Sequence, residues 1–154
     1  MKWHMSNRAD PEARVLADRH YNRQKVGAPQ FVPPGRCLVL KTRPADAFWV
    51  TSWPFAEYVK HAWAGAWVCS AFRNASKHLS SELIREALAA TVAFFGPAPV
   101  GMVTFVDESK TRRKKDPGYC YLKAGFSPAG RTKAGLVALY IAPWEMPSAE
   151  AARP

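Results

Sequence analysis

Two adjoining segments of this chain carry the residue types best suited to chemistry, a basic run and the tyrosine-containing segment after it. The run "KTRRKK" places five positive charges on Lys110, Arg112, Arg113, Lys114 and Lys115. The segment "PGYCYLKAGF" follows at once and contains Tyr121. Clustered Lys and Arg side chains neutralise phosphates without reading base sequence. The run is therefore expected to contact a polyanion; the alternative is a solvated charged loop.

The overall charge agrees with a polyanionic partner. The 154 residues have a formal net charge of +10, which favours nucleic acid first and a membrane surface second. Some small proteins are simply basic, and this remains the alternative. With 48% hydrophobic residues the chain is expected to form one globular domain.

The sequence also bears on the compartment. No apolar run reaches the roughly 18–20 residues that span a bilayer, and the N-terminus has no signal-peptide core. The expected location is the cytoplasm, with no membrane partner. The three cysteines Cys37, Cys69 and Cys120 form no CxxC pair, so we expect reduced core cysteines rather than a zinc ribbon or a disulfide framework.

The helices and strands that must position Tyr121 can be predicted from the apolar runs and from the capping, glycine and proline residues between them. Asp10, Pro11 and Glu12 predict the capped start of a helix that runs to about Lys25. The later elements are expected to be a hairpin (36–40 and 47–53), a strand (66–74), a helix (80–95), a strand (100–107), a short helix (118–126) and a closing strand (135–141). This order predicts an α/β fold, because a strand–helix–strand crossover requires parallel pairing. A single domain over 1–142 and a loose tail over 143–154 are expected.

The last third of the chain resembles the GNAT acyltransferases. In that family a short helix ends in Tyr-x-x-x-Gly-Phe before the final hairpin, and Tyr121 to Phe126 ("YLKAGF") matches this pattern. A strand, a long helix and another strand precede it in the family's order. The resemblance implies a mixed, mostly antiparallel central sheet flanked by helices. It also implies that Tyr121 reprotonates the departing thiolate of coenzyme A, a task that suits a phenol because its pKa lies near 10. The alternative is a core tyrosine.

One stretch departs from the GNAT pattern. The family's glycine-rich pyrophosphate loop corresponds to "RNASKHLSS", residues 73–81, which contains no glycine. An acyl-CoA-type donor is still expected, bound by Arg73 and Asn74 and by backbone N–H groups at Ser80 and Ser81, where a helix begins. The alternatives are that the two serines only cap the helix and that Arg73 is a surface arginine at a strand end.

A second resemblance is to the phage Mom-type proteins, a divergent GNAT branch that hypermodifies adenine in DNA and so blocks host restriction. It is carried by "RHYNRQ" (19–24), "AFRN" (71–74), "LSSELI" (79–84), "GMVTFVD" (101–107) and "PGYCYLKAGF" (117–126). In these proteins a His-Tyr pair and an Asp are associated with iron and with activity. The matching residues here are His20, Tyr21 and Asp107, a plausible ligand set for iron. A solvated or structural His20 is the alternative.

Together these resemblances imply an enzyme that modifies the N6 of adenine in double-stranded DNA by carbamoylmethylation, and a homodimer is compatible with this role. They also imply that the basic run contacts this DNA through Lys110, Arg112, Arg113, Lys114 and Lys115. Two further hypotheses stay open at this point. One is an ordinary GNAT N-acetyltransferase that uses acetyl-CoA on a protein or small-molecule amine. The other is a noncatalytic basic DNA-binding module. A fold as widely reused as this one does not separate them.

Overall fold

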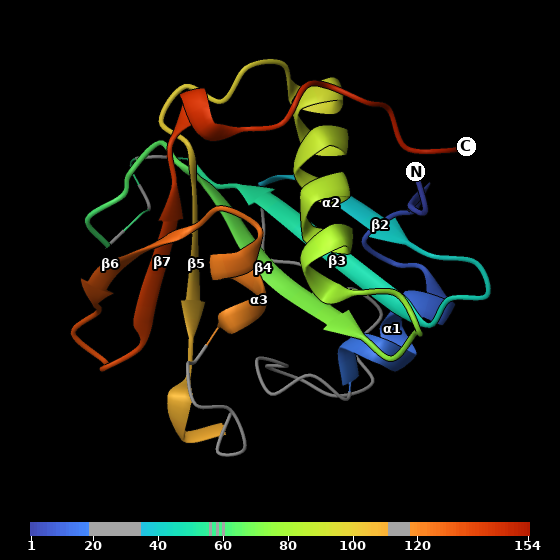
Figure 1. The fold of residues 1–154 in the computed structure, drawn as a ribbon, viewed down its shortest axis with the longest axis horizontal. Helices are drawn as coiled ribbons and strands as arrows, with labels where there is room; N and C mark the ends of the chain where they lie inside the picture. The colour runs from blue at the N-terminus through green and yellow to red at the C-terminus, as the bar shows by residue number, and fades with distance from the viewer. Residues whose placement is uncertain (19–34, 56, 58, 60, 111–117) are drawn as a thin grey trace.

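The protein is built on one twisted seven-stranded sheet (Figure 1). The computed structural model describes residues 1–18, 35–55, 57, 59, 61–110 and 118–154. The strands lie in the order β1-β2-β3-β4-β5-β7-β6. Their bounds are β1 His4–Met5, β2 Arg36–Lys41, β3 Ala47–Trp53, β4 Trp67–Asn74, β5 Met102–Val106, β6 Ser127–Arg131 and β7 Val137–Ile141. Every neighbouring pair is antiparallel except β4 and β5, so the predicted mixed, mostly antiparallel α/β architecture is confirmed.

Helices cover the two faces of the sheet unequally. The long helix α2 (Ser80–Phe95) and the short helix α3 (Tyr119–Lys123) pack on one face, where the main core lies. Helix α1 (Pro11–Asp18) packs on the other face through its buried residues Ala13, Leu16 and Ala17, against Val39, Phe48 and Val50. Alternate residues of β2 and β3 therefore face opposite helices, as the two-residue period of a strand requires.

A chain of buried polar groups fixes α2 on β3. The side chain of Thr91 donates to the carbonyl of Ala87 one turn earlier (2.7 Å) and lies 2.9 Å from the hydroxyl of Thr51. The indole N–H of Trp49 donates to that same hydroxyl at 2.7 Å. All three side chains are fully buried, and each polar group has a partner, as buried polar groups require. The helix is thus held by specific bonds as well as by apolar packing.

Most of the expected elements are present at or near their predicted bounds. The hairpin is β2–β3, and the expected strand–helix–strand crossover is β4–α2–β5 with its parallel pair. The Asp10 cap is also confirmed, because its carboxylate accepts the N–H of Glu12 at 2.9 Å. Helix α1 is described as far as Asp18; the remainder of the predicted helix lies outside the described residues. Strands β1 and β6 were not predicted.

The C-terminal segment differs from the loose tail that was expected. Residues 143–145 form a 3₁₀ turn (η3), and the N–H of Glu150 donates to Ala89 of α2. The backbone of Arg153 exchanges hydrogen bonds with Trp3 and Met5 at 2.9 and 2.8 Å. The segment is thereby tied to both α2 and β1, because its backbone finds partners that a free tail would leave to water.

In the described part of the chain, no helix combines the length and the apolar character that crossing a membrane would require.

Gly101 sets the spacing at the start of β5. Its carbonyl accepts the N–H of Trp67 at 2.9 Å, which begins the pairing of β4 with β5. Its φ is +95°, and a Cβ at this position would collide with the backbone oxygen of Ile141 on β7. Gly130 has the same φ of +95°, but a Cβ there would meet nothing within 4 Å.

We expect Gly101→Ala to lower the free energy of unfolding by roughly 3–5 kcal/mol, because it adds a backbone collision to the strain of a positive φ. Gly130→Ala, the matched control, should cost only the strain, about 1–2 kcal/mol. Urea denaturation of the two variants measures the difference. Equal losses would show that the contact between β5 and β7 at Gly101 does not constrain the sheet.

Candidate functional site

The sheet opens where the parallel pair ends. Strands β4 and β5 pair at only three positions, the last being Cys69 with Thr104. Beyond it β4 continues to Asn74 beside β3, and β5 continues to Val106 beside β7. On the other side of β4, Thr51 pairs with Cys69 while Val50 pairs with Ala71, which leaves Ser70 as an extra residue in a bulge. Bulges bend a strand and are frequent next to active sites.

Tyr121 lies at the point where the two strands part. Its side chain is 9% exposed, and its hydroxyl is 3.5 Å from the sulfur of Cys69. Thr104, the partner of Cys69, donates its hydroxyl hydrogen to the carbonyl of Cys69 at 3.1 Å. Helix α3 therefore places the Tyr121 phenol beside the last residue pair of β4 and β5, on the face of the sheet that α2 also covers.

The Tyr-x-x-x-Gly-Phe pattern has a local structural cause. Gly125, at φ +111°, ends helix α3 and allows the N–H of Phe126 to return to the carbonyl of Tyr121 at 3.0 Å. The Phe126 ring then packs edge-on against the Tyr121 ring, with centroids 5.4 Å apart. Phe72 of β4 contacts the same ring at 6.2 Å. Glycine and phenylalanine thus fix the direction of the tyrosine side chain.

Burial sets the protonation states of the two groups that meet here. Removal from water raises the pKa of the Tyr121 phenol well above its ordinary value near 10, and the neighbouring Cys69 raises this pKa further. Burial likewise raises the pKa of the Cys69 thiol to about 12, although the hydrogen bond from Tyr121 opposes this rise. At neutral pH both groups are protonated, so the phenol can act as a proton donor to a thiolate that forms beside it.

The structure places the predicted donor-binding residues at the other end of β4. Asn74 closes the loop before α2: its amide N–H groups donate to His78 and Ser80, and its amide oxygen accepts from Ser76. Arg73 is half-buried and pairs with Phe48 of β3. Asn74 lies five residues beyond Cys69, roughly 16 Å along an extended strand. Tyr121 and this loop could therefore contact opposite ends of one extended donor.

Ser80 and Ser81 begin α2 but do not cap it. The N-cap residue is Leu79, which has no side-chain cap, so the alternative that the serines serve as caps is wrong. The N–H groups of Glu82 and Leu83 donate to the carbonyl of Leu79. Within the described residues, the N–H groups of Ser80 and Ser81 are the ones left at this helix end for an anion.

Asp107 has a structural task of its own. Its carboxylate accepts the N–H of Ser109 at 3.1 Å and the hydroxyl of Ser109 at 2.6 Å, and so holds the 3₁₀ turn η2 (Glu108–Lys110) that follows β5. Among the described residues, no three His, Cys, Asp or Glu side chains gather into a group that could hold a metal ion. His20 and Tyr21 lie outside these residues, so the predicted iron site stays a prediction.

The basic run is described only at its beginning. Lys110 is the last residue of η2, while Arg112, Arg113, Lys114 and Lys115 lie outside the described residues. The run therefore follows β5 in sequence, on the same connection that leads to Tyr121, and its contact with DNA remains a prediction.

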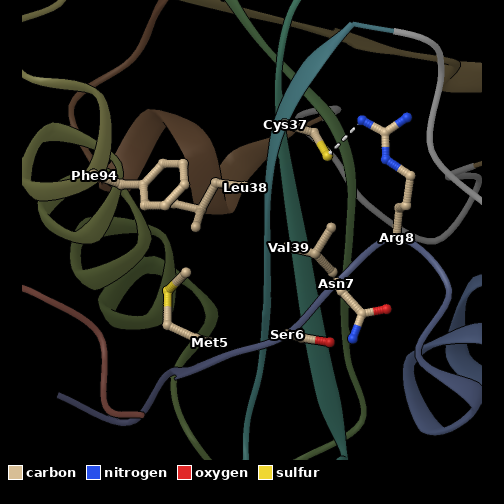
Figure 2. Close-up of a pocket in the computed structure, with 8 residues that line it drawn as sticks. All are labelled: Met5, Ser6, Asn7, Arg8, Cys37, Leu38, Val39 and Phe94. Atoms are coloured by element: carbon tan, nitrogen blue, oxygen red, sulfur yellow. Dashed lines mark hydrogen bonds between the residues drawn. The ribbon is translucent and has the colours of Figure 1, made fainter.

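A groove elsewhere on the molecule contains none of the predicted site residues (Figure 2). It has a volume of about 290 Å³ and lies at the edge of β2, with Leu38 and Phe94 on its apolar side. At its polar end the guanidinium of Arg8 donates to the sulfur of Cys37 at 3.1 Å and to the carbonyl of Gly35 at 2.6 Å. Ser6 donates to Asp10, and Asn7 accepts the N–H of Ala9, so these polar side chains also have partners within the protein. We assign the groove no part in the chemistry of Tyr121.

Sequence reasoning missed two members of the Tyr121 site, Cys69 and Thr104. Cys69 was expected only as a core cysteine, and Thr104 carried no signal. Their meeting with Tyr121 depends on the register of the parallel pair, which no local pattern encodes.

Comparison with known proteins adds no relative: neither a protein-family model, nor a curated protein, nor a solved structure matches this chain. The resemblance to the GNAT and Mom-type families therefore rests on the motifs given above.

The buried thiol predicts a loss of stability in alkali. The unfolded chain gives up the Cys69 proton above pH 9, whereas the folded protein keeps it until about pH 12, so the unfolded state is increasingly favoured between these values. Cys69 alone should cost about 2–3 kcal/mol between pH 8 and pH 11. Urea midpoints at the two pH values should show a smaller loss for Cys69→Ser. The half-buried Cys37 is the control, and Cys37→Ser should lose as much as the wild type; an unchanged loss in Cys69→Ser would contradict the assignment.

Proposed function

We propose that this protein is a GNAT-like transferase of the Mom type that modifies the N6 of adenine in DNA. The observation that carries the proposal is the position of the Tyr121 hydroxyl. It lies 3.5 Å from a sulfur atom, at the point where β4 and β5 part, on a phenol that burial keeps protonated. A group held in this way is suited to protonating a thiolate leaving group.

The order of the elements supports the proposal. A strand, a long helix and a parallel strand (β4, α2, β5) precede α3, and the hairpin β6–β7 follows it. This is the order on which the GNAT resemblance depends. The positive charge supports a nucleic-acid substrate. Five Lys and Arg residues lie between β5 and α3 in the sequence, and the net charge is +10.

In the proposed reaction the adenine N6 attacks the carbonyl carbon of a thioester donor, so the product is an N6-acyl adenine rather than the carbamoylmethyl group that the Mom resemblance implies. A C–N bond forms, the C–S bond breaks, and the sulfur leaves as a thiolate. Tyr121 gives its proton to that thiolate and recovers one from solvent, which also takes the proton lost by N6. Because N6 is paired inside duplex DNA, the base must be flipped out or already exposed.

The donor would extend from Tyr121 along β4 towards the start of α2. There Arg73 and the backbone N–H groups of Ser80 and Ser81 would meet its phosphates. The missing glycines mean that phosphates would meet a loop closed by Asn74 rather than an open backbone cradle. No step is routed through iron, because His20 and Tyr21, two of the three residues expected to hold it, lie outside the described residues.

The first test is mass spectrometry of nucleosides from the DNA of cells that express the protein. We expect a deoxyadenosine of increased mass, and a rate of formation about 10²–10⁴-fold lower in Tyr121→Phe, which removes the acid. Tyr119→Phe is the matched control, since Tyr119 lies on the same helix but is 51% exposed. Normal deoxyadenosine in cells that contain folded wild-type protein would contradict the proposal. DNA binding that survives Tyr121→Phe without any modified nucleoside would instead indicate a noncatalytic module.

The second test concerns the basic run. If its side chains contact phosphates, each charge removed should reduce the slope of log Kobs against log salt concentration by about 0.9. The triple variant Lys110→Gln, Arg112→Gln, Arg113→Gln should therefore bind duplex DNA with a slope shallower by about 2.7. Arg43→Gln, which removes an exposed charge from the turn between β2 and β3, should leave the slope unchanged. Fluorescence anisotropy at several salt concentrations measures both, and a wild-type slope in the triple variant would place the DNA elsewhere.

A further inference from the structure

Three side chains meet at the last parallel pair of the sheet, and the proposed reaction uses only one of them. Cys69 and Thr104 face each other across β4 and β5, and the Tyr121 hydroxyl reaches Cys69 from α3. Cys69 is 4% exposed and Thr104 3% exposed. Buried polar groups of this kind must share their few hydrogens among their few acceptors, so the direction of each hydrogen bond can be worked out.

The hydrogens can be assigned one by one. Thr104 has a single hydroxyl hydrogen, and it goes to the carbonyl of Cys69 at 3.1 Å. The Cys69 thiol also has one hydrogen, which points to the carbonyl of Ala71 at 3.9 Å, a group that can only accept. Either atom could donate in the contact between Cys69 and Tyr121; because the thiol hydrogen is directed at Ala71, we take the sulfur as the acceptor and the phenol as the donor.

From this direction we infer that Cys69 is a positioning residue: its sulfur accepts the Tyr121 hydroxyl hydrogen and holds it at the point where β4 and β5 part. The inference deepens the proposed function and rests on it for its catalytic meaning. The resident sulfur accepts a hydrogen bond from the phenol in the resting state, at the position from which a leaving thiolate would take the proton during the reaction. Cys69 itself is not the nucleophile, because its buried thiol stays protonated and its hydrogen is directed at the bulge.

The bulge at Ser70 gives this arrangement its geometry. The extra residue separates Cys69, which faces α2 and α3, from Ala71, which packs on the α1 side of the sheet. The carbonyl of Ala71 can then face the thiol two residues earlier.

The hydrogen bond can be tested without DNA or donor. The infrared spectrum of the wild type minus that of Cys69→Ala isolates the S–H stretching band of Cys69. The same subtraction in the Tyr121→Phe background should show only a small shift, because the sulfur has lost its donor while the S–H group keeps its acceptor, Ala71. A large shift to higher frequency would mean that the thiol had donated to the phenol, and it would overturn the inference. In the Tyr119→Phe background the band should not move. An unshifted band in Tyr121→Phe would overturn the inference, and circular dichroism verifies that each variant is folded.

The catalytic part is tested by the rate of adenine modification. Cys69→Ala and Cys69→Ser both remove the volume of sulfur, but only serine restores an acceptor. We expect Cys69→Ala to lose about 10-fold or more in rate, and Cys69→Ser to recover most of it, with DNA affinity unchanged in both. Equal losses in the two variants, or no loss in alanine, would overturn the positioning role. If the wild type modifies no DNA, the proposed function fails, while the infrared comparison still decides whether Cys69 orients Tyr121.

Discussion

The structure depends on a short parallel contact between β4 and β5. Because two parallel strands cannot be joined by a tight turn, the chain between them must cross over, and α2 is that crossover. The contact extends over three residue pairs, so β4 and β5 are paired with each other at one end only. At the other end β4 pairs with β3 alone, and β5 pairs with β7 alone. The two strands therefore separate in the middle of a continuous sheet, and Tyr121 of α3 lies at the point of separation.

The residues at this point combine packing with chemistry. Tyr121 is part of the main hydrophobic core, in contact with Phe72 and Phe126, and its hydroxyl is the polar end of that core. A core tyrosine and a catalytic tyrosine are therefore compatible descriptions of the same side chain. The low polarity that makes the ring a good packing element is also what keeps its proton in place. The ring contacts and the contact of the hydroxyl with Cys69 hold Tyr121 in place before any substrate binds. Such prior positioning favours efficient proton transfer.

The sequence allowed the elements to be predicted wherever a local cause was present. Helix α2 has an apolar face and an ending glycine, and the hairpin β2–β3 has two apolar runs with a turn between them. Strand β6 was not predicted because "SPAGR" is mostly exposed and contains no apolar alternation. Strand β1 is two residues long, too short for a pattern. Within the site, Tyr121 could be found from its motif, whereas Cys69 and Thr104 are 35 residues apart and are joined only by strand register.

The hydroxyl chain of Trp49, Thr51 and Thr91 has a consequence for how the sheet chooses its alignment. An apolar core tolerates sliding, since one hydrophobic residue can replace another with small cost. A slip of β3 by one residue would turn Trp49 and Thr51 together to the opposite face, while Thr91 would keep its bond to Ala87. The contact between Thr51 and Thr91 would be lost, which costs about 0.5–1.5 kcal/mol, and the Trp49 ring would leave the main core. Trp49 and Thr51 thus discriminate between the native alignment and its nearest competitors, and the alignment that they select is the one that carries the bulge beside Cys69.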